Sequence, residues 1–482
     1  MTTSKSAAMK GVLSALAVAG SLSFAAGQAQ AAATIVINNL NAPGVGFNDT
    51  TVVAPVGGNV GTTLGAQRLI AFTYAANIWG ATLTSNQPII INAQFSALSC
   101  TATGATLGSA GATSIFRDFA GAPKAGTWYS YALANKISGA YQGTLNAAQI
   151  NANFNVNLGQ TGCLDGTFFY LGLDANHGAN VDFVTVLLHE MGHGIGFQTF
   201  TNGSTGAQNG GFPSIWDHYL LDASTGLLWK DETNAQRAAS SISVDQLVWT
   251  GPLVTATLPS VLTLGSPNLA ISGPAAGPAT GNYAVGTASF GAAIANVPVT
   301  GQVMPVVDQA NGTGLACTTL SATNARAVAG NIALVDRGVC GFAIKAAVVQ
   351  AAGAIAMIVA DNVAGSPPPG LGGTDPTIVI PSVRITQADG VTIKAQLNRR
   401  SRTASGVIAS LGLVGSQYQG ADALGRMKMF APNPYQSGSS VSHYDVTAFR
   451  NQLMEPAING DLTHSVLPPE DLTFRLLQDI GW

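Results

Sequence analysis

Apolar residues recur at two different spacings in the first two hundred positions, and each spacing predicts a different kind of element. From Leu64 to Leu83 they return every three or four residues, which is typical of an amphipathic helix, and Thr63 is placed to cap its first turn. A second helix is predicted from about 181 to 194. Alternating or β-branched runs predict strands at residues 34–38, 89–95 and 166–173. Helices mixed with strands in this way indicate an α+β unit.

The hydrophobic pattern of the chain changes at about residue 290. Residues 331–340 predict a strand, 341–354 an Ala-rich helix, and 355–362 a fully apolar strand. Strand, helix and strand in this order indicate a small α/β domain with a buried central sheet. The segment before it, from about 255 to 290, is rich in Leu, Pro, Ala and Gly, and we interpret it as a linker or as irregular strands.

Two further stretches lie outside this small domain. Residues 200–280 are rich in Gly, Ser, Thr and Asn, which predicts loops. The packing anchors expected among these loops are Trp216, Trp229 and Trp249. Near the end of the chain, Pro469 to Asp471 open a predicted helix and Gly481 stops it. Its apolar stripe consists of Leu472, Leu476 and Ile480.

Composition and charge narrow the classes of function. Only 9% of the residues are charged and the net charge is −3, so the chain offers no basic surface to nucleic acid or to a membrane. Lysines precede an apolar run from Gly11 to Gly27 that ends in small residues at Ala31, which predicts a secretory signal over residues 1–31. Later apolar stretches are too short to span a bilayer. We therefore expect an exported mature chain, secreted or periplasmic, without a transmembrane segment.

One motif carries recognisable chemistry. His189 and His193 are four residues apart, so a helix places both imidazoles on one face, where they can bind a single zinc ion. Glu190 lies between them and can reach a water molecule in an open coordination position, where a carboxylate acts as general base. The HExxH pattern therefore predicts a zinc hydrolase site.

The motif by itself leaves the third zinc ligand open. Gly196 stands three residues after His193, as in HExxHxxGxxH zincins, but Thr199 occupies the position of the third histidine. The glycines around His193 are poor helix formers, which indicates that the helix ends just after His193 and that the chain then turns sharply. The remaining candidates are His177, His218, His443 and His464, with Glu232 as the ligand of a gluzincin-like alternative.

Several stretches in a fixed order resemble the leishmanolysin-type metzincins: HEMGHGIGF, SHYD, LMEP and LLQDIGW. In that family an insertion separates the third histidine from the first two, and a Met-turn follows it. The resemblance implies zinc ligands His189, His193 and His443, general base Glu190, and Met454 beneath the metal. It also implies a metzincin-like domain with a twisted sheet, an active-site helix and a C-terminal Met-turn subdomain. No tyrosine directly follows Met454, which leaves Tyr444 as the candidate for a tyrosine that assists the oxyanion.

A second resemblance concerns the insertion. IALVDRGVCGFAIKAAVVQAAGAIAMIVADN, followed by IPSVRITQADG, is similar to the protease-associated (PA) domain over roughly residues 290–412. Such domains are regarded as non-catalytic lids or binding modules. The predicted organisation is a signal peptide at 1–31, a metallopeptidase domain split between 34–254 and 413–482, and a linker with the inserted PA domain at 255–412.

The four cysteines follow the same organisation. An even number of cysteines in an exported chain favours two disulfides. Cys317 and Cys340 fall inside the PA-like region, whereas Cys100 and Cys163 fall in the zinc domain. Because pairing within folding units is the simpler outcome, we predict the bonds Cys100–Cys163 and Cys317–Cys340.

The loop DANHGANVD, at 174–182, has Asp and Asn at alternate positions, as calcium loops do. It lacks the glycine placement and the closing glutamate of the EF-hand pattern. We favour a turn in which Asn180 or Asp182 caps the zinc helix, with calcium binding as the alternative.

Two functional hypotheses follow from these residues. The first is an exported zinc endopeptidase that cleaves protein or peptide substrates with Glu190 as general base. The second is an exported binding or surface-interaction protein whose metalloprotease fold has become inactive. It is motivated by the charge-poor, Gly-rich chain and by the lack of an obvious pro-segment. One zinc ion per chain is expected under the first hypothesis.

Overall fold

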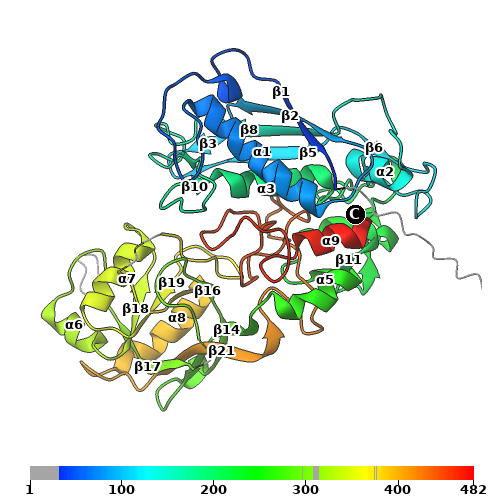
Figure 1. Ribbon diagram of the computed structural model, residues 1–482. Coiled ribbons are helices and arrows are strands. Elements are labelled where there is room, and N and C mark those ends of the chain that lie inside the picture. The colour runs from blue at the N-terminus through cyan, green and yellow to red at the C-terminus, as the bar shows by residue number, and fades with distance from the viewer. Residues whose placement is uncertain (1–31, 296, 308–313, 374, 376) are drawn as a thin grey trace, which may run out of the picture.

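A computed structural model describes residues 32–295, 297–307, 314–373, 375 and 377–482. The predicted signal peptide at 1–31 lies outside these residues. The molecule has two bodies (Figure 1). One combines the N-terminal half of the chain with its C-terminal end, and the other is built from the middle of the chain. Within the described residues, no helix is both long enough and apolar enough to cross a membrane.

The N-terminal elements are β1 (Ile35–Asn39), α1 (Leu64–Thr82), β2 (Ile89–Ser96), β3 (Cys100–Thr101), β4 (Gly104–Ala105), β5 (Gly108–Ala112), β6 (Ile115–Phe116), β7 (Tyr129–Ser130), α2 (Tyr131–Ser138), β8 (Ile150–Asn155), β9 (Phe169–Tyr170), β10 (Val181–Asp182) and α3 (Phe183–Ile195). The main sheet has the order β1-β2-β8-β5. Its first three strands are parallel, whereas β5 pairs antiparallel with β8 and forms one edge. The predicted strand at 166–173 is mostly wrong, because only Phe169 and Tyr170 are extended and paired.

Helices α1 and α3 pack on one face of this sheet, as the hydrophobic pattern requires (Figure 1). Every second residue of β2 is buried beneath them. Helix α1 begins after Thr63, whose side chain accepts the amide hydrogen of Ala66, as predicted. Its buried stripe includes Phe72 and Trp79, but Leu69, which has the helical spacing predicted for this stripe, is exposed. Small alanines share the buried face instead, so the helix approaches the sheet closely.

The middle body is built from β14 (Leu264–Ser272), β15 (Gly281–Ala284), β16 (Gly286–Thr287), β17 (Val299–Pro305), α6 (Ala322–Val328), β18 (Ile332–Asp336), α7 (Phe342–Ala351), β19 (Ala356–Ala360), β20 (Ser382–Ile385), α8 (Gln387–Gln396) and β21 (Ile408–Tyr418). Its sheet has the order β15-β14-β21-β17-β18-β19-β20-β16, and β17 to β20 are parallel. Alternate residues of β18 enter two different apolar clusters, one on each face of the sheet. The prediction of a buried central sheet is confirmed.

Of the two interpretations of residues 255–290, a linker or irregular strands, the structure supports the strands, because β14, β15 and β16 lie in this segment. Strand β14 is nine residues long and pairs antiparallel with β21 along its whole length. Gly265 and Pro267 interrupt the apolar pattern of β14, so the sequence alone indicates an irregular strand at most. Because β14 opens the middle body and β21 closes it, the chain enters and leaves this body on neighbouring strands.

The remaining elements join the first body. They are β11 (Leu220–Asp222), β12 (Leu227–Leu228), α4 (Asn234–Ser240), β13 (Leu247–Trp249), α5 (Pro252–Thr257) and α9 (Thr473–Ile480). Short 3₁₀ turns occur at Gly46–Asn48, Asn209–Gly211, Trp216–His218, Trp229–Asp231, Leu258–Ser260, Gly277–Ala279 and Leu397–Arg399. Trp216, Trp229 and Trp249 are fully buried, so all three predicted anchors are confirmed. Helix α9 begins at Thr473, later than predicted.

Both predicted disulfides are present. Cys100, in β3, is bonded to Cys163. Cys317 is bonded to Cys340 in the middle body. Each bond closes a loop within one body, which is the reason that the pairing could be predicted.

Candidate metal centre

Helix α3 carries the histidine pair, and its ends are set by two residues. Asp182 is the N-cap, and its side chain accepts the amide hydrogen of Thr185, which confirms the predicted cap. Gly196 ends the helix with a φ of 144°, a backbone conformation that favours glycine. The helix continues to Ile195, two residues beyond His193, so the prediction that it ends just after His193 is approximate.

The other two glycines of the motif serve packing rather than helix termination. A Cβ atom on Gly194 would lie 2.3 Å from Cγ2 of Ile150 in β8. A Cβ atom on Gly192 would lie 2.9 Å from Sδ of Met454. These glycines let the sheet and the loop of Met454 approach opposite parts of the same helical turn, and any side chain would push them apart.

Three histidines converge at this helix. Nε2 of His193 lies 3.1 Å from Nε2 of His189 and 3.1 Å from Nε2 of His443, and the third separation is 3.3 Å. Three nitrogens at zinc-bond length in a tetrahedral arrangement would be roughly 3.3–3.4 Å apart. Among the described residues, no other group of three or more His, Cys, Asp or Glu side chains comes together in this way. The geometry therefore fits a single metal ion held by three imidazoles.

The opposite ring nitrogen of each histidine contacts a backbone carbonyl. The Nδ1 atoms of His189, His193 and His443 lie 2.7–2.8 Å from the carbonyl oxygens of Leu453, Phe197 and Ser439, in that order. A carbonyl only accepts hydrogen bonds, so each Nδ1 carries the hydrogen and each Nε2 presents a lone pair. Burial lowers the pKa of His189 to about 4 and that of His193 to about 3, and it holds that of His443 well below its ordinary value. The site therefore contains neutral imidazoles, the form that binds metals.

Glu190 lies beside the three histidines and is almost completely buried. Burial raises the pKa of its carboxyl group to about 8. A hydrogen bond from the amide of Ala110 has the opposite, smaller effect, because it favours the charged form. A Cβ atom on Gly108 would lie 2.9 Å from both Cγ and Oε1 of Glu190, so the backbone of β5 approaches this side chain directly. The side chain of Glu190 thus lies between helix α3 and the edge strand β5 of the sheet.

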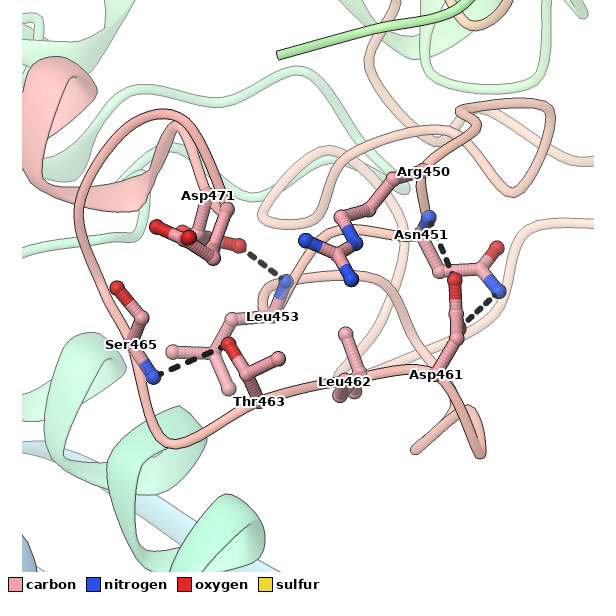
Figure 2. A pocket seen from close by; sticks show the side chains of 9 residues that line it. Arg450, Asn451, Leu453, Asp461, Leu462, Thr463, Ser465 and Asp471 are labelled. Carbon is pink, nitrogen blue, oxygen red and sulfur yellow. Dashed lines mark hydrogen bonds between the residues drawn. The ribbon is translucent and has the colours of Figure 1, made fainter.

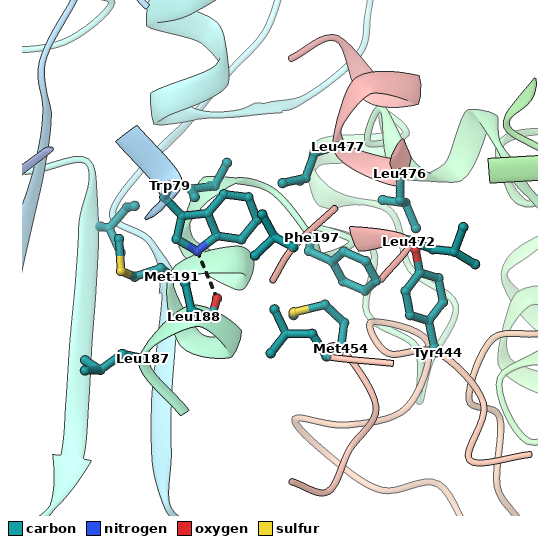
Figure 3. Close-up of a cluster of buried hydrophobic side chains, with 14 of the residues drawn as sticks. Trp79, Leu187, Leu188, Met191, Phe197, Tyr444, Met454, Leu472, Leu476 and Leu477 are labelled. Carbon is teal, nitrogen blue, oxygen red and sulfur yellow. Dashed lines mark hydrogen bonds between the residues drawn. The ribbon is translucent and has the colours of Figure 1, made fainter. Parts of the chain in front are cut away.

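Met454, eleven residues after His443, packs against helix α3 at Gly192. Its side chain is fully buried, and Figure 3 shows it in an apolar cluster with Leu188, Phe197 and Leu472. The indole nitrogen of Trp79 donates to the carbonyl oxygen of Leu188 in the same cluster (Figure 3). The residue predicted to lie beneath the metal therefore packs against the turn of α3 between the two histidines.

The other candidates for the third ligand lie elsewhere. His218 contacts the hydroxyl of Thr127, and half-buried His177 contacts the carbonyl of Asn180. The remaining two candidates are also engaged outside the cluster: His464 is paired with Asp182, and Glu232 accepts from Thr225. The structure thus brings His443, and none of these four, to the histidine pair.

Two weaker predictions lose support. Tyr444 is fully buried, and its ring packs on Phe197, so its hydroxyl has no path to a substrate and cannot assist an oxyanion in this structure. In the loop at 174–182, Asp174 accepts from Tyr170 and Asn176, and no cluster of metal-binding acids forms among the described residues. The loop instead contributes the cap of α3 at Asp182.

Several residues that hold the three histidines in place could not be predicted from the sequence. Thr199 donates to the buried carboxylate of Asp217, and its amide donates to the hydroxyl of Ser442, the residue before His443. Asp471 accepts from the amide of Leu453, whose carbonyl holds His189. No periodicity or motif marks these positions, because most of the contacts involve backbone atoms.

Comparison with known proteins identifies the middle body. Residues 299–393 match the PA domain family, so this part of the chain is a PA domain, as the sequence suggested. The match ends within α8 and covers all of β17 to β20. A comparison with curated protein sequences finds no match.

Solved structures resemble this chain only in part. A zinc aminopeptidase from Bacillus subtilis shares 18% identity over 34% of this chain and 36% of its own, with a TM-score of 0.23. An aminopeptidase from Aneurinibacillus sp. strain AM-1 shares 17% identity over 42% of each chain, with a TM-score of 0.21. A subtilisin-like protease from Pseudoalteromonas sp. AS-11 shares 20% identity over 32% of this chain and 35% of its own, with a TM-score of 0.22. This chain thus spans less than half of each, and such TM-scores do not indicate a common overall fold.

Proposed function

We propose that this protein is an exported zinc endopeptidase of the leishmanolysin-like metzincin type. The observation that carries the proposal is the convergence of three neutral imidazole nitrogens beside the buried carboxylate of Glu190. The PA domain between the second and third histidines is consistent with a protease, as its family name implies. The signal sequence expected at 1–31 supports export.

The donor set favours zinc over other common metals. Three imidazoles without a thiolate or a carboxylate, arranged on one side of the ion, are typical of catalytic zinc sites that keep a fourth position open. The three ring nitrogens are already within 3.3 Å of one another, so metal binding requires little movement of the chain. Calcium, which requires six or more oxygen ligands, does not suit this site.

Zinc and Glu190 have different roles in the proposed hydrolysis. Zinc, when bound, supplies a Lewis acid that polarises a carbonyl group and lowers the pKa of water toward neutrality. Glu190 accepts the proton of the attacking water and passes it to the leaving amine. Its raised pKa, about 8 in the metal-free site, suits a group that must both take up and release a proton near neutral pH. The bound cation will lower this pKa and favour the charged base.

The edge strand β5 is the surface that can align a substrate. One side of β5 pairs with β8, and its other side has no partner strand among the described residues. An extended peptide can add to such an edge through backbone hydrogen bonds, which act on most sequences. Because β5 runs past Glu190 at Gly108, a peptide paired with it would extend to both sides of the bond being cleaved. This arrangement favours an endopeptidase.

The test is the variant Glu190→Gln, which keeps the size of the side chain and removes the base. Zinc content and cleavage of an unfolded protein substrate are measured together, with Asp231→Asn, a change at an exposed carboxylate, as control. We expect Glu190→Gln to retain stoichiometric zinc and to lose on the order of 10² to 10⁴ in rate. Undiminished cleavage would refute the assignment. Stoichiometric zinc without any cleavage by the native chain would favour the inactive binding protein.

A further inference from the structure

The loop at 451–455 connects the metal centre to the C-terminal helix through a single residue. The carbonyl oxygen of Leu453 lies 2.7 Å from Nδ1 of His189 and accepts its hydrogen. The amide nitrogen of Leu453 donates to Oδ2 of Asp471 at 2.6 Å (Figure 2). The backbone of one residue is therefore held by a buried carboxylate on one side and holds a ligand histidine on the other.

Asp471 is itself held rigidly. It is 2% exposed, and its second oxygen accepts from the amide of Thr473 at 2.6 Å, at the start of α9. Gln452 reinforces the connection, because its side-chain oxygen accepts from the amide of Leu472. Arg450 and Asp471 line the same small pocket (Figure 2). Each carboxylate oxygen therefore already has a backbone donor, and the carboxylate cannot rotate without losing one of them.

The three histidines differ in the sequence distance to the carbonyl group that orients each ring. The carbonyl that holds His193 belongs to Phe197, four residues later, and the one that holds His443 belongs to Ser439, four residues earlier. The carbonyl that holds His189 is 264 residues away in sequence. Only His189 therefore depends on a distant segment, and that segment has to be fixed in place by something else.

We propose that Asp471 is a positioning residue for the metal centre, which orients His189 by fixing the peptide group of Leu453. The inference rests on the proposed zinc-peptidase function. Met454 follows Leu453 directly and packs against α3 at Gly192, so the same short loop controls the ring of His189 and the surface beneath it. Groups that orient a ligand histidine commonly affect metal affinity by about 10- to 100-fold, although they do not touch the metal.

The test compares Asp471→Asn with the matched control Asp479→Asn. Asparagine can accept only one of the two backbone hydrogens, so it breaks one of the bonds that hold Leu453 and Thr473. Asp479 lies within α9, whereas Asp471 precedes this helix. The carboxylate of Asp479 accepts from the backbone amides of Leu253 and Val254 and has no contact with the loop at 451–455. Both variants should lose stability, and only Asp471→Asn should change the metal centre.

The measurements are zinc affinity by competition with a chelator, the visible spectrum of the cobalt-substituted protein, and kcat and KM for peptide cleavage. We expect Asp471→Asn to bind zinc about 10- to 100-fold more weakly, to alter the cobalt bands and to lower kcat more than it changes KM. Asp479→Asn should match the native protein in all three. Equal zinc affinity and equal spectra in the two variants would overturn the proposal.

Two outcomes separate this proposal from the function on which it rests. If the native protein binds neither zinc nor cobalt, the proposed function fails. If the native protein binds zinc and only the comparison fails, the role of Asp471 fails alone. Should Asp471→Asn not fold, Asp471→Glu takes its place, because it keeps the charge and displaces the carboxylate by one methylene. Zinc affinity in Asp471→Glu equal to that of Asp479→Asn would then overturn the proposal.

Discussion

The close packing of α3 against β8 allows a quantitative prediction for Gly194→Ala. On an isolated helix this change stabilises by about 1 kcal/mol, since glycine is a poor helix former. Here the new Cβ atom would lie 2.3 Å from Cγ2 of Ile150. Carbon atoms in contact are about 3.5–4.0 Å apart, so the helix or the strand must move by more than 1 Å. Ile150 is fully buried on a central strand and has little freedom to yield.

Overpacking of a core commonly costs about 1–3 kcal/mol, and this contact belongs at the upper end of that range. Subtracting the gain in helix propensity leaves a loss of stability of about 1–2 kcal/mol. Urea unfolding followed by tryptophan fluorescence measures this loss, in the presence of a chelator so that metal binding does not contribute. All six tryptophans lie outside the middle body at 264–418, so the signal reports on the body that contains Gly194.

A double-mutant cycle with Ile150→Ala tests the reason for the loss. By itself, Ile150→Ala should destabilise by about 2–5 kcal/mol because it leaves a cavity. In the double variant, Ile150→Ala removes the atoms that clash and gives the new methyl group of Gly194→Ala space. The loss of stability of the double variant should therefore be smaller than the sum of the two single losses by about 1 kcal/mol or more. Strict additivity, or a stabilising effect of Gly194→Ala alone, would refute the packing argument.

Two further predictions concern other parts of the chain. Burial raises the pKa of Asp471 to about 6 from an ordinary 3.8, so between pH 4 and 6 the folded state binds more protons there than the unfolded state. As the pH rises through this window, the metal-free native protein should therefore lose up to about 3 kcal/mol of unfolding free energy relative to Asp471→Asn. Urea titrations at several pH values measure the difference in unfolding free energy between the two proteins, and a difference that does not change with pH would contradict the prediction. Replacing Cys317 and Cys340 by serine opens a bond with a sequence separation of 23, which should destabilise the PA domain by about 3 kcal/mol. Circular dichroism should detect that loss, and a matching shift of the tryptophan transition would show that the two bodies do not unfold independently.

Elements with a regular pattern could be predicted from the sequence, whereas elements that depend on distant partners could not. The cap at Thr63, the alternation of β2 and the helix with the histidine pair follow from local spacing, and the structure confirms them. The length and pairing of strand β14 could not be predicted, because its partner β21 begins more than a hundred residues later and its own pattern is interrupted.

The candidate site divides in the same way. The pair His189 and His193 is visible because helical geometry relates residues four positions apart. His443 was one of several open candidates until a resemblance selected it, and local patterns could not favour it over His218. Asp471 acts through backbone atoms, so its contribution could be recognised only from the folded arrangement. The purpose of Gly194 was misread for a similar reason, since the strand that requires it is remote in sequence.

The separation of His193 from His443 by 250 residues has a consequence for biosynthesis. A ribosome that adds about 5–20 residues per second needs roughly 12 to 50 seconds to travel from one to the other. During that interval the nascent chain presents two metal-binding side chains and lacks the third. The segment that braces His189 is made later still. The peptidase activity proposed above therefore cannot arise until late in synthesis, because the candidate metal centre is among the last parts of the molecule to be completed.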